Sequence, residues 1–460
     1  MINIYVAGIV SDNLKAQVQA INPRATTSFQ YASDNPQDKS IMWISCICHV
    51  IALSINAFFQ EDPFSQMLED FKTIVAVLRR KPIRQFIKST CIAPSNTRWN
   101  VIFLQMIWII KHTDEIIALM HCPDKNIKVY TDPIKETINK VLLEVIPGLA
   151  FPLHYVAAAV TEAQSDSFQA AYTYSLIPTL KSQITEAVNI ITSETKESSC
   201  RPAVLQHCTE ASKSLTNAIS FMFTKHAHTS LLQLMYTLTP EGRSDFRRSF
   251  PAAVAKNDPP TATIGKRGIN PMQQNKSTII NYINSLDQIK ARLNSEADEE
   301  APIFDSTEEL NCSTDEYSSD DDSEISRTTE LGEANDGHEI DDDDPTALLT
   351  NTLTEYLILN HEQADVDKAV QCLLNWLMLS TDDLTVTPLI KTSALQVWRY
   401  LSAKKEWKTL ADFALRCLSL VASESGVERL FSQHKHVVDY LRRRTSKELR
   451  VARLIFKLRE

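Results

Sequence analysis

Two carboxylates at opposite ends of the chain stand in settings that suit a metal-dependent reaction. Asp12 follows the apolar run IYVAGIV (residues 4–10), and Glu428 lies in SESGVERLFS (residues 423–432). Open α/β sheets bind ligands at the carboxyl ends of their strands, where a carboxylate such as Asp12 can hold a divalent cation. Glu428 would lie at the edge of the buried face of a helix, where a metal or Arg429 must compensate its charge. The structural alternatives are an Asx turn at Asp12 and a solvated or Arg-paired Glu428.

Two further stretches carry residue types that bind metals or nucleic acids. CICH contains Cys46, Cys48 and His49, which are zinc-ligand types, although a buried cysteine pair beside a helix-capping histidine is the alternative. SNTRWN places Arg98 beside Trp99. A guanidinium binds phosphate and an indole stacks on an unpaired or flipped base, so this pair predicts contact with nucleic acid. A tryptophan that only anchors its segment on the core is the alternative.

The elements that must position these residues are mainly helices. IYVAGIV reads as a strand, and IMWISCICHVIALSINAFF (41–59) reads as a strand that runs into a helix beginning near His49. From about residue 64 to 245, apolar residues recur at helical spacing, as in QMLEDFKTIVAVLRR, LQMIWIIKHTDEIIALM and PTLKSQITEAVNIIT. Residues 256–276 have the composition of a linker, and helical patterns return after Pro345. The chain has only eight glycines and no glycine-rich phosphate loop.

The charge of the chain is distributed unevenly. The formal net charge is −10, but the stretch from Glu296 to Asp344 contains 21 acidic residues and a single basic one, Arg327. This acidic segment carries −20, which leaves +10 on the rest of the chain and suits a polyanionic partner. Its composition predicts disorder, because it has too little apolar surface to offset the entropy of folding. Nine scattered cysteines, and a densest apolar run too short to cross a bilayer, predict a reducing compartment and no membrane partner.

Together and in this order, the four stretches resemble the hAT family of DNA transposases. The matching pieces are SDN beside a strand end, the C-x-x-H of Cys46 to His49, the TRWN ending at Asn100, and S-x-S-x-x-E-R-x-F-S at residues 423–432. Two weaker pieces agree. TEAQSDSFQAAYTYSLIPTLKSQI resembles the helical segment that precedes a "PTL" turn in such enzymes, and ALQVWRYLSAKKEWKTLADFALRCLSLVASESGVERLFS resembles their C-terminal dimerisation region. The resemblance covers nearly the whole chain apart from the acidic segment.

The resemblance implies a ribonuclease-H-like α/β core, incomplete at its N-terminus, with a large all-α domain inserted before its last catalytic helix. The chain is then mostly helical overall, and Glu428 returns beside Asp12 across more than 400 residues. The parts that the resemblance implies are residues 1–63, the first half of the core; 64–293, the helical insertion; 294–346, the disordered acidic segment; 347–387, the end of the insertion; and 388–460, the dimerisation region with the last core helices.

The resemblance also implies a two-metal chemistry. In the family, three carboxylates hold two divalent ions, one that activates water or a DNA 3′-hydroxyl and one that stabilises the leaving oxygen. Asp12 resembles the second aspartate of this set and Glu428 resembles the final glutamate. In an active enzyme these two side chains would bind Mg²⁺ or Mn²⁺.

The other motif residues resemble the DNA-contacting part of the same site. Arg98 and Trp99 resemble the pair beside the flipped base at the end of the transposable element. Cys46 and His49 resemble the motif that lines the site. The expected partner is therefore DNA, and the expected compartment is the nucleus.

The sequence departs from the family before Asp12. The family's first catalytic aspartate lies several dozen residues earlier, whereas only eleven residues precede Asp12 and none of them is acidic. The first three strands and the usual BED-type zinc finger also have no counterpart. We therefore expect a truncated, transposase-derived protein that retains dimerisation and DNA binding without strand transfer. Two alternatives stay open: a functional hAT transposase whose N-terminal exon is missing from this sequence, and a helical scaffold unrelated to DNA.

Apolar side chains near the C-terminus predict self-association as a homodimer or higher oligomer. They give more apolar surface than one short helical region needs, and the basic run Arg442, Arg443 and Arg444 follows them. A hydrophobic patch beside a positive one suits a subunit contact that flanks DNA. The alternative is that these side chains complete the core of their own chain. The residues concerned are Trp398, Tyr400, Leu401, Leu415, Leu418 and Leu420.

Overall fold

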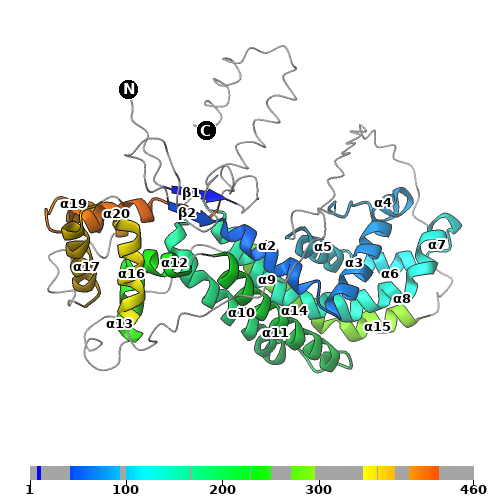
Figure 1. Cartoon of the computed structure of the whole chain (residues 1–460). Helices are drawn as coiled ribbons and strands as arrows, with labels where there is room; N and C mark the ends of the chain where they lie inside the picture. The colour runs from blue at the N-terminus through cyan, green and yellow to red at the C-terminus, as the bar shows by residue number, and fades with distance from the viewer. Residues whose placement is uncertain are drawn as a thin grey trace, which may run out of the picture.

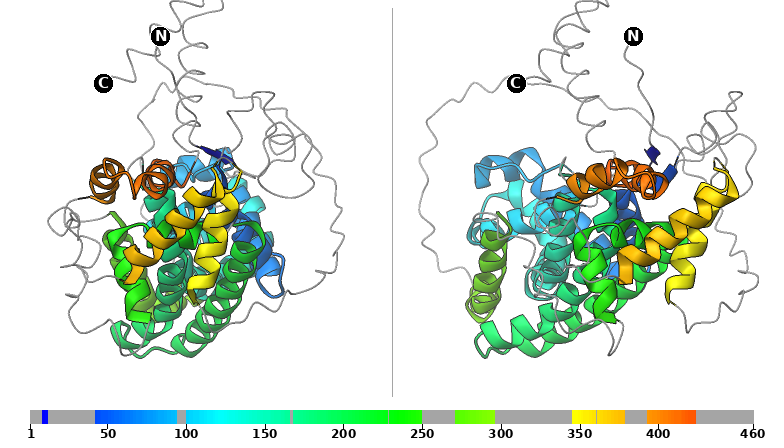
Figure 2. Two further views of the ribbon diagram at one scale, coloured as in Figure 1. Left: turned by 60° about the vertical axis from the view of Figure 1, so that its left-hand side comes forward. Right: turned by 90° about the vertical axis from the view of Figure 1, so that its left-hand side faces the viewer.

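Helices make up most of the structure. In the views of Figures 1 and 2, two short strands lie at one side of a mass of helices. The mostly helical character that the sequence predicts is confirmed, whereas a ribonuclease-H-like core stays a prediction, because two paired strands alone do not define one. The computed structural model describes residues 8–11, 42–93, 100–165, 168–227, 229–249, 271–295, 345–359, 361–378 and 393–423.

The two strands form a parallel pair. In this pair β1 (Gly8–Ser11) lies beside β2 (Met42–Ser45), with Ser11 opposite Ser45 at the last register position. β2 runs almost directly into α2 (Ile47–Phe58), as predicted for a helix beginning near His49. The apolar residues of α2 recur at helical spacing, so that one face is buried against α9 and α11.

The remaining helices form three packed groups. One end of the molecule holds α3 (Phe64–Leu78), α4 (Lys81–Ile87), α5 (Asn100–Lys111), α6 (Thr113–Met120), α7 (Lys125–Thr131), η1 (Asp132–Ile134), α8 (Lys135–Lys140) and α15 (Leu286–Asn294). The centre holds η2 (Val141–Val145), α9 (Ile146–Ala163), α10 (Thr173–Glu194), α11 (Arg201–His226) and α14 (Pro271–Asn284). The other end holds η3 (Ala170–Tyr172), α12 (Thr229–Thr237), α13 (Pro240–Ser249), α16 (Pro345–Leu357), α17 (Gln363–Met378), α19 (Ala394–Ser402) and α20 (Lys408–Leu418).

The apolar pattern over residues 104–120 forms two helices instead of one. His112 leaves the helical conformation (φ −114°, ψ 23°) between α5 and α6, and its ring stacks on Trp108 with centroids 4.2 Å apart. The hydroxyl of Thr113 donates to the carbonyls of Ile109 and Ile110, both at 3.0 Å.

Two other expectations are corrected. Pro178 of the "PTL" sequence lies inside α10 and not in a turn. The buried residues Leu180 and Ile184 that follow it hold the helix against its neighbours, and this packing outweighs the missing N–H of the proline. The linker expected over 256–276 is helical from Pro271 onward, because proline fits the first helical position.

One helical stretch in the described part of the chain has the length and composition of a membrane span. It runs from Lys125 to Ala163, and 78% of its apolar window is buried inside the molecule. All of α9 belongs to it, and α9 packs against α2, α5, α10, α11 and α14. Such burial is typical of the central helix of a helical core.

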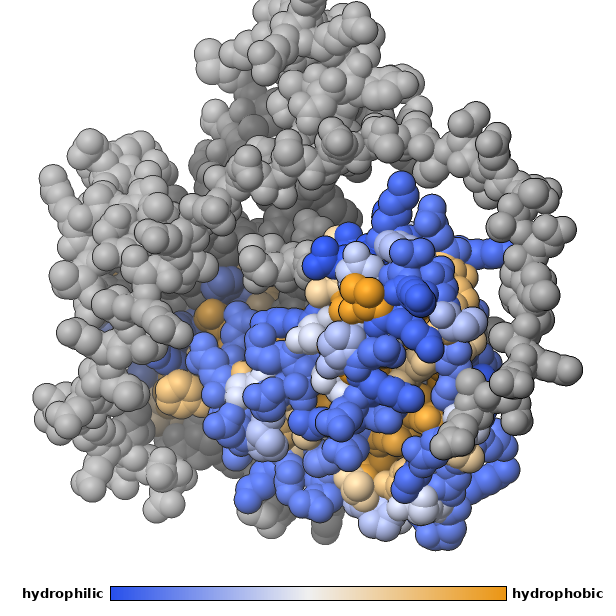
Figure 3. Space-filling model, turned by 90° about the vertical axis from the view of Figure 1, so that its right-hand side faces the viewer, coloured by the Kyte–Doolittle hydropathy of each residue, from blue (hydrophilic) through white to orange (hydrophobic). Residues whose placement is uncertain are grey.

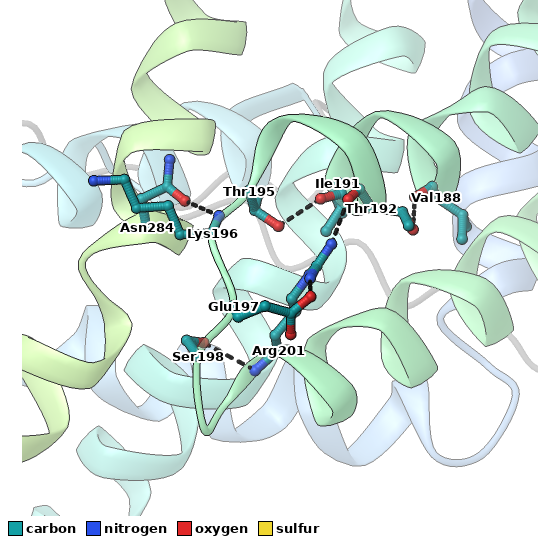
Figure 4. Close-up of polar contacts among 9 residues, drawn as sticks. All are labelled: Val188, Ile191, Thr192, Thr195, Lys196, Glu197, Ser198, Arg201 and Asn284. Carbon is teal, nitrogen blue, oxygen red and sulfur yellow. Dashed lines mark hydrogen bonds and ion pairs between the residues drawn. The ribbon is translucent and has the colours of Figure 1, made fainter.

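The turn between α10 and α11 is fixed by polar contacts (Figure 4). Arg201, whose side chain is almost fully buried, donates from its guanidinium to the carboxylate of Glu197 and to the backbone carbonyl of Thr192. The side-chain oxygen of Asn284 in α14 accepts the backbone N–H of Lys196 at 2.7 Å. Backbone N–H and carbonyl groups that lack a partner within the helices are therefore hydrogen-bonded, and these bonds fix the path of the turn between α10 and α11.

Candidate functional site

The parallel strands bring two predicted motif segments to one edge of the sheet. Ser11 and Ser45 are paired at the last register position of β1 and β2. Asp12 directly follows Ser11, and Cys46 directly follows Ser45. Asp12 itself lies outside the described residues. The register alone shows that the chain segments carrying SDN and CICH leave the sheet side by side, at the edge where α/β proteins place their ligands.

The segment that opens the SESGVERLFS motif joins them. The backbone N–H of Ile47 donates to the carbonyl of Ala422 at 3.0 Å. The thiol of Cys46 donates to the hydroxyl of Ser423 at 3.8 Å, a contact between residues 377 positions apart in sequence. Both side chains are buried, with exposures of 3% and 6%. The first residue of the C-terminal motif therefore contacts the first residue of the C-x-x-H motif. We call the place where these segments meet the junction at Cys46.

A third segment of the chain supports this junction from the other side. The N–H of Ala170 donates to the carbonyl of Leu420 at 2.8 Å, and the N–H of Ala422 donates to the carbonyl of Phe168 at 3.3 Å. An isolated antiparallel bridge joins Gln169 to Val421. Residues 420–423 thus lie between the 168–170 segment and the start of α2, and backbone hydrogen bonds on both sides fix their path.

Cys46 and His49 occupy the start of α2. Cys46 is the residue that precedes the helix, and its carbonyl accepts the backbone N–H groups of His49 at 3.0 Å and Val50 at 3.1 Å. Cys48 is half-buried and its thiol contacts the carbonyl of Val160 at 4.0 Å. The zinc interpretation of CICH gains no support, because within the described ranges no group of three His, Cys, Asp or Glu side chains is arranged to hold a metal.

Any Mg²⁺ or Mn²⁺ at this junction would need other ligands. These ions prefer oxygen donors, whereas the motif residues described here, Cys46 and His49, offer a thiol and an imidazole. Asp12 and Glu428, the carboxylates that the sequence predicts for this role, both lie outside the described residues. Their role in metal binding therefore stays a prediction.

A histidine that the sequence did not point to adjoins the same edge. The hydroxyl of Ser45 donates to the backbone carbonyl of His226, the last residue of α11, at 2.6 Å. Burial lowers the pKa of His226, and electrostatic interactions with Lys225 and His49 lower it further. The lowered pKa favours the neutral form of the His226 imidazole. No local sequence pattern could have found His226, because only the packing of α11 on α2 brings it here.

Five of the predicted DNA-contacting residues fall outside the described ranges. Arg98 and Trp99 lie between Ala93 and Asn100, and Arg442, Arg443 and Arg444 follow Ser423. The structure therefore neither places these five side chains nor brings them to the junction at Cys46.

The structure places most of the predicted dimerisation residues in the chain's own core. Trp398, Leu401 and Leu418 are 0%, 2% and 1% exposed. The indole N–H of Trp398 donates to the carbonyl of Leu238 at 2.7 Å, and its ring lies 4.9 Å from that of Trp376. These three side chains complete the core, which is the alternative that the sequence left open. Leu415 is half-buried, and a subunit contact would have to use it or exposed neighbours.

Comparisons of this chain with protein-family models and with curated proteins found no match.

Proposed function

We propose that this protein is derived from a DNA transposase and retains DNA binding and self-association. The observation that carries the proposal is the meeting of three motif segments at Cys46. The segments carrying SDN, C-x-x-H and S-x-S-x-x-E-R are far apart in sequence, and each contributes a residue next to the same strand ends. A helical scaffold with chance motif matches has no reason to bring all three together.

Chain connectivity supports a site shared by Asp12 and Glu428. Consecutive Cα atoms are about 3.8 Å apart and paired strands lie about 4.8 Å apart, so the Cα atoms of Asp12 and Cys46 lie within about 12 Å. Glu428 follows Ser423 by five residues, which limits their Cα separation to about 18 Å. Both carboxylates can therefore reach the junction.

The first prediction concerns the salt dependence of DNA binding. Each lysine or arginine contact to a duplex phosphate contributes about −0.9 to the slope of log K against log salt. Replacing Arg442, Arg443 and Arg444 together by glutamine should make this slope shallower by up to about 2.7. Fluorescence anisotropy with a labelled duplex over a salt series measures it.

The matched control changes the charge equally on other surfaces. Lys196→Gln, Lys213→Gln and Lys405→Gln replace three exposed lysines outside the predicted site and should leave the slope unchanged. If the unaltered chain shows no DNA binding even at low salt, the proposed function is wrong. If the chain, extended by an upstream coding segment, nicks DNA with Mg²⁺ and both Asp12→Asn and Glu428→Gln abolish nicking, the active transposase is the better description.

The second prediction concerns self-association. Tyr400 lies on α19 and is 42% exposed, with the Lys404 ammonium 5.2 Å from its ring centre. Because aromatic anchors dominate subunit contacts, Tyr400→Asp should weaken a dimer by about tenfold or more in sedimentation velocity. Phe221→Asp is the control: Phe221 is 59% exposed on α11 and has the same arrangement with Lys225, at 5.6 Å. Equal effects of the two variants would contradict a contact through α19.

A further inference from the structure

A second basic surface lies at the opposite end of the molecule from the C-terminal helices, around α4 (Figure 1). From Phe71 to Thr113 the chain has eight lysine and arginine residues and no acidic residue. Four of the basic side chains are exposed on α4 and the residues that flank it, and we call them the α4 surface: Arg80, Lys81, Arg84 and Lys88. Seen from that end, hydrophilic residues cover most of the visible face, with smaller apolar areas between them (Figure 3).

Three side chains of the α4 surface, Arg80, Lys81 and Arg84, form no ion pair with a described residue, whereas several exposed basic side chains near them do. Lys72 pairs with Glu69 at 2.8 Å and Lys140 with Asp70 at 2.6 Å. Arg292 likewise pairs with Asp114. In the described part of the chain, no carboxylate forms an ion pair with Arg80, Lys81 or Arg84; the guanidinium of Arg80 instead lies 6.0 Å from the ring centre of Tyr130.

The fold holds these charges together on a short rigid element. Pro82 stands in the first turn of α4, and Lys88 ends the helix in the left-handed conformation (φ 55°). Ile83 and Ile87 are buried, at 0% and 6% exposure, and fix the helix to the core. The stretch from Arg80 to Lys88 rises about 12 Å along its axis. Like charges kept this close repel one another, and a bound polyanion would relieve that repulsion.

Residues beside α4 and in α5 hydrogen-bond to Cys91 and Ile92, which come shortly before the segment that carries Arg98 and Trp99. Arg79, which precedes it, donates to the carbonyl of Cys91, and Gln105 of α5 donates to the carbonyl of Ile92 at 2.8 Å. α4 and α5 both pack against α6. The chain therefore enters the 94–99 segment beside α4 and leaves it at the start of α5.

We propose that the α4 surface binds the phosphate backbone of duplex DNA. The inference rests on the proposed function and adds a phosphate-binding surface at the end of the molecule far from the C-terminal helices. Basic helices that bind lipid surfaces also bury an apolar face in the membrane. The isoleucines of α4 are already buried inside the protein, and Phe86, 38% exposed, is the large apolar side chain left outside on this helix. Phosphate contact through side-chain charges fits this arrangement better.

The test compares two charge-matched triple variants of the full chain. The first is Arg80→Gln, Lys81→Gln and Arg84→Gln; the control is Lys196→Gln, Lys213→Gln and Lys405→Gln. Affinity for a labelled duplex is measured by anisotropy over a salt series. Losing three phosphate contacts should reduce affinity about a hundredfold at 0.15 M salt and make the salt slope shallower by about 2.7. The control should bind within about twofold of the unaltered chain. Circular dichroism melting checks that both variants are folded.

The outcomes separate the two proposals. If the unaltered chain binds DNA and the α4 triple variant behaves like the control, the α4 surface has no phosphate contacts and this inference is overturned while the proposed function stands. If the unaltered chain does not bind DNA at all, both fail. Binding to phosphatidylserine vesicles that the α4 variant loses, with unchanged DNA binding, would assign the surface to lipid and also overturn the inference.

Discussion

Trp398→Ala is expected to lower the free energy of unfolding by about 3–5 kcal/mol, the range measured when large aromatic side chains are removed from cores. Trp398 is fully buried between the rings of Trp376, at 4.9 Å, and Trp407, at 6.5 Å. Its removal leaves a cavity and also leaves the carbonyl of Leu238 without its indole donor. Urea unfolding followed by circular dichroism measures the loss.

Two further variants divide this effect into its parts. Trp398→Phe keeps an aromatic ring and loses mainly the hydrogen bond to Leu238, so about 1–3 kcal/mol should be lost. Tyr400→Ala, an exposed position on the same helix, should change stability by about 0.5 kcal/mol or less. If Trp398→Ala were as mild as Tyr400→Ala but dissociated a dimer, the tryptophan would belong to an interface and not to the core.

The second large effect is acid instability caused by His154. This residue of α9 is 4% exposed and lies among aromatic rings, with centroids 5.9 Å from Phe103 and 5.3 Å from Tyr155. In the described structure its Nδ1 atom is buried without a hydrogen-bond partner. Burial lowers the pKa of His154 to about 4, and the positive charge of Lys276 adds to this effect. The folded state therefore holds the ring neutral.

The sign of the pH dependence follows from that depressed pKa. The unfolded chain binds a proton at His154 below about pH 6.5, whereas the folded chain binds it only near pH 4. Stability is thus fully present above pH 6.5 and decreases as the pH falls toward 4, by about 3 kcal/mol in total.

His154→Leu isolates this contribution from that of the carboxylates. Leucine suits the apolar surroundings and cannot titrate, so the variant should be as stable as the unaltered chain at pH 7 and about 3 kcal/mol more stable near pH 4. Urea unfolding at a series of pH values gives the difference between the two proteins. A difference that stays constant between pH 7 and 4 would show that His154 does not control acid stability.

Several features of the fold follow from local sequence because local interactions cause them. The β2–α2 transition at CICH combines a β-branched apolar run with a following helical pattern, and the structure has both. The helices α3, α10, α16, α17, α19 and α20 arise where apolar residues recur at helical spacing. The break at His112 was missed because the apolar spacing continues across it, and the continuity of α10 through Pro178 was missed because it depends on tertiary packing.

The candidate site was predictable only in part. The order of the motifs in the sequence suggested that distant segments meet, and the Cys46–Ser423 contact places the first residue of the C-terminal motif at Cys46. The basic residues of α4 carry a signal that the sequence does contain, a run of eight positive charges without an acid. Whether these charges form ion pairs could be read only from the structure, because ion pairing depends on distances between elements and not on composition.

The sequence by itself determined which faces of the helices are apolar, where the charge is concentrated and which residues carry recognisable chemistry. Tertiary structure decided what each apolar face packs against: Trp398 could have met a second subunit, and it meets Trp376 and the carbonyl of Leu238 instead. Tertiary structure also brought His226 to Ser45 and, within the described part of the chain, left Arg80, Lys81 and Arg84 without an ion-paired carboxylate. The physical reason is that hydrophobic periodicity predicts which face of a helix is buried but not which segment covers that face. Contacts and ion pairs between distant segments form only when those segments pack together.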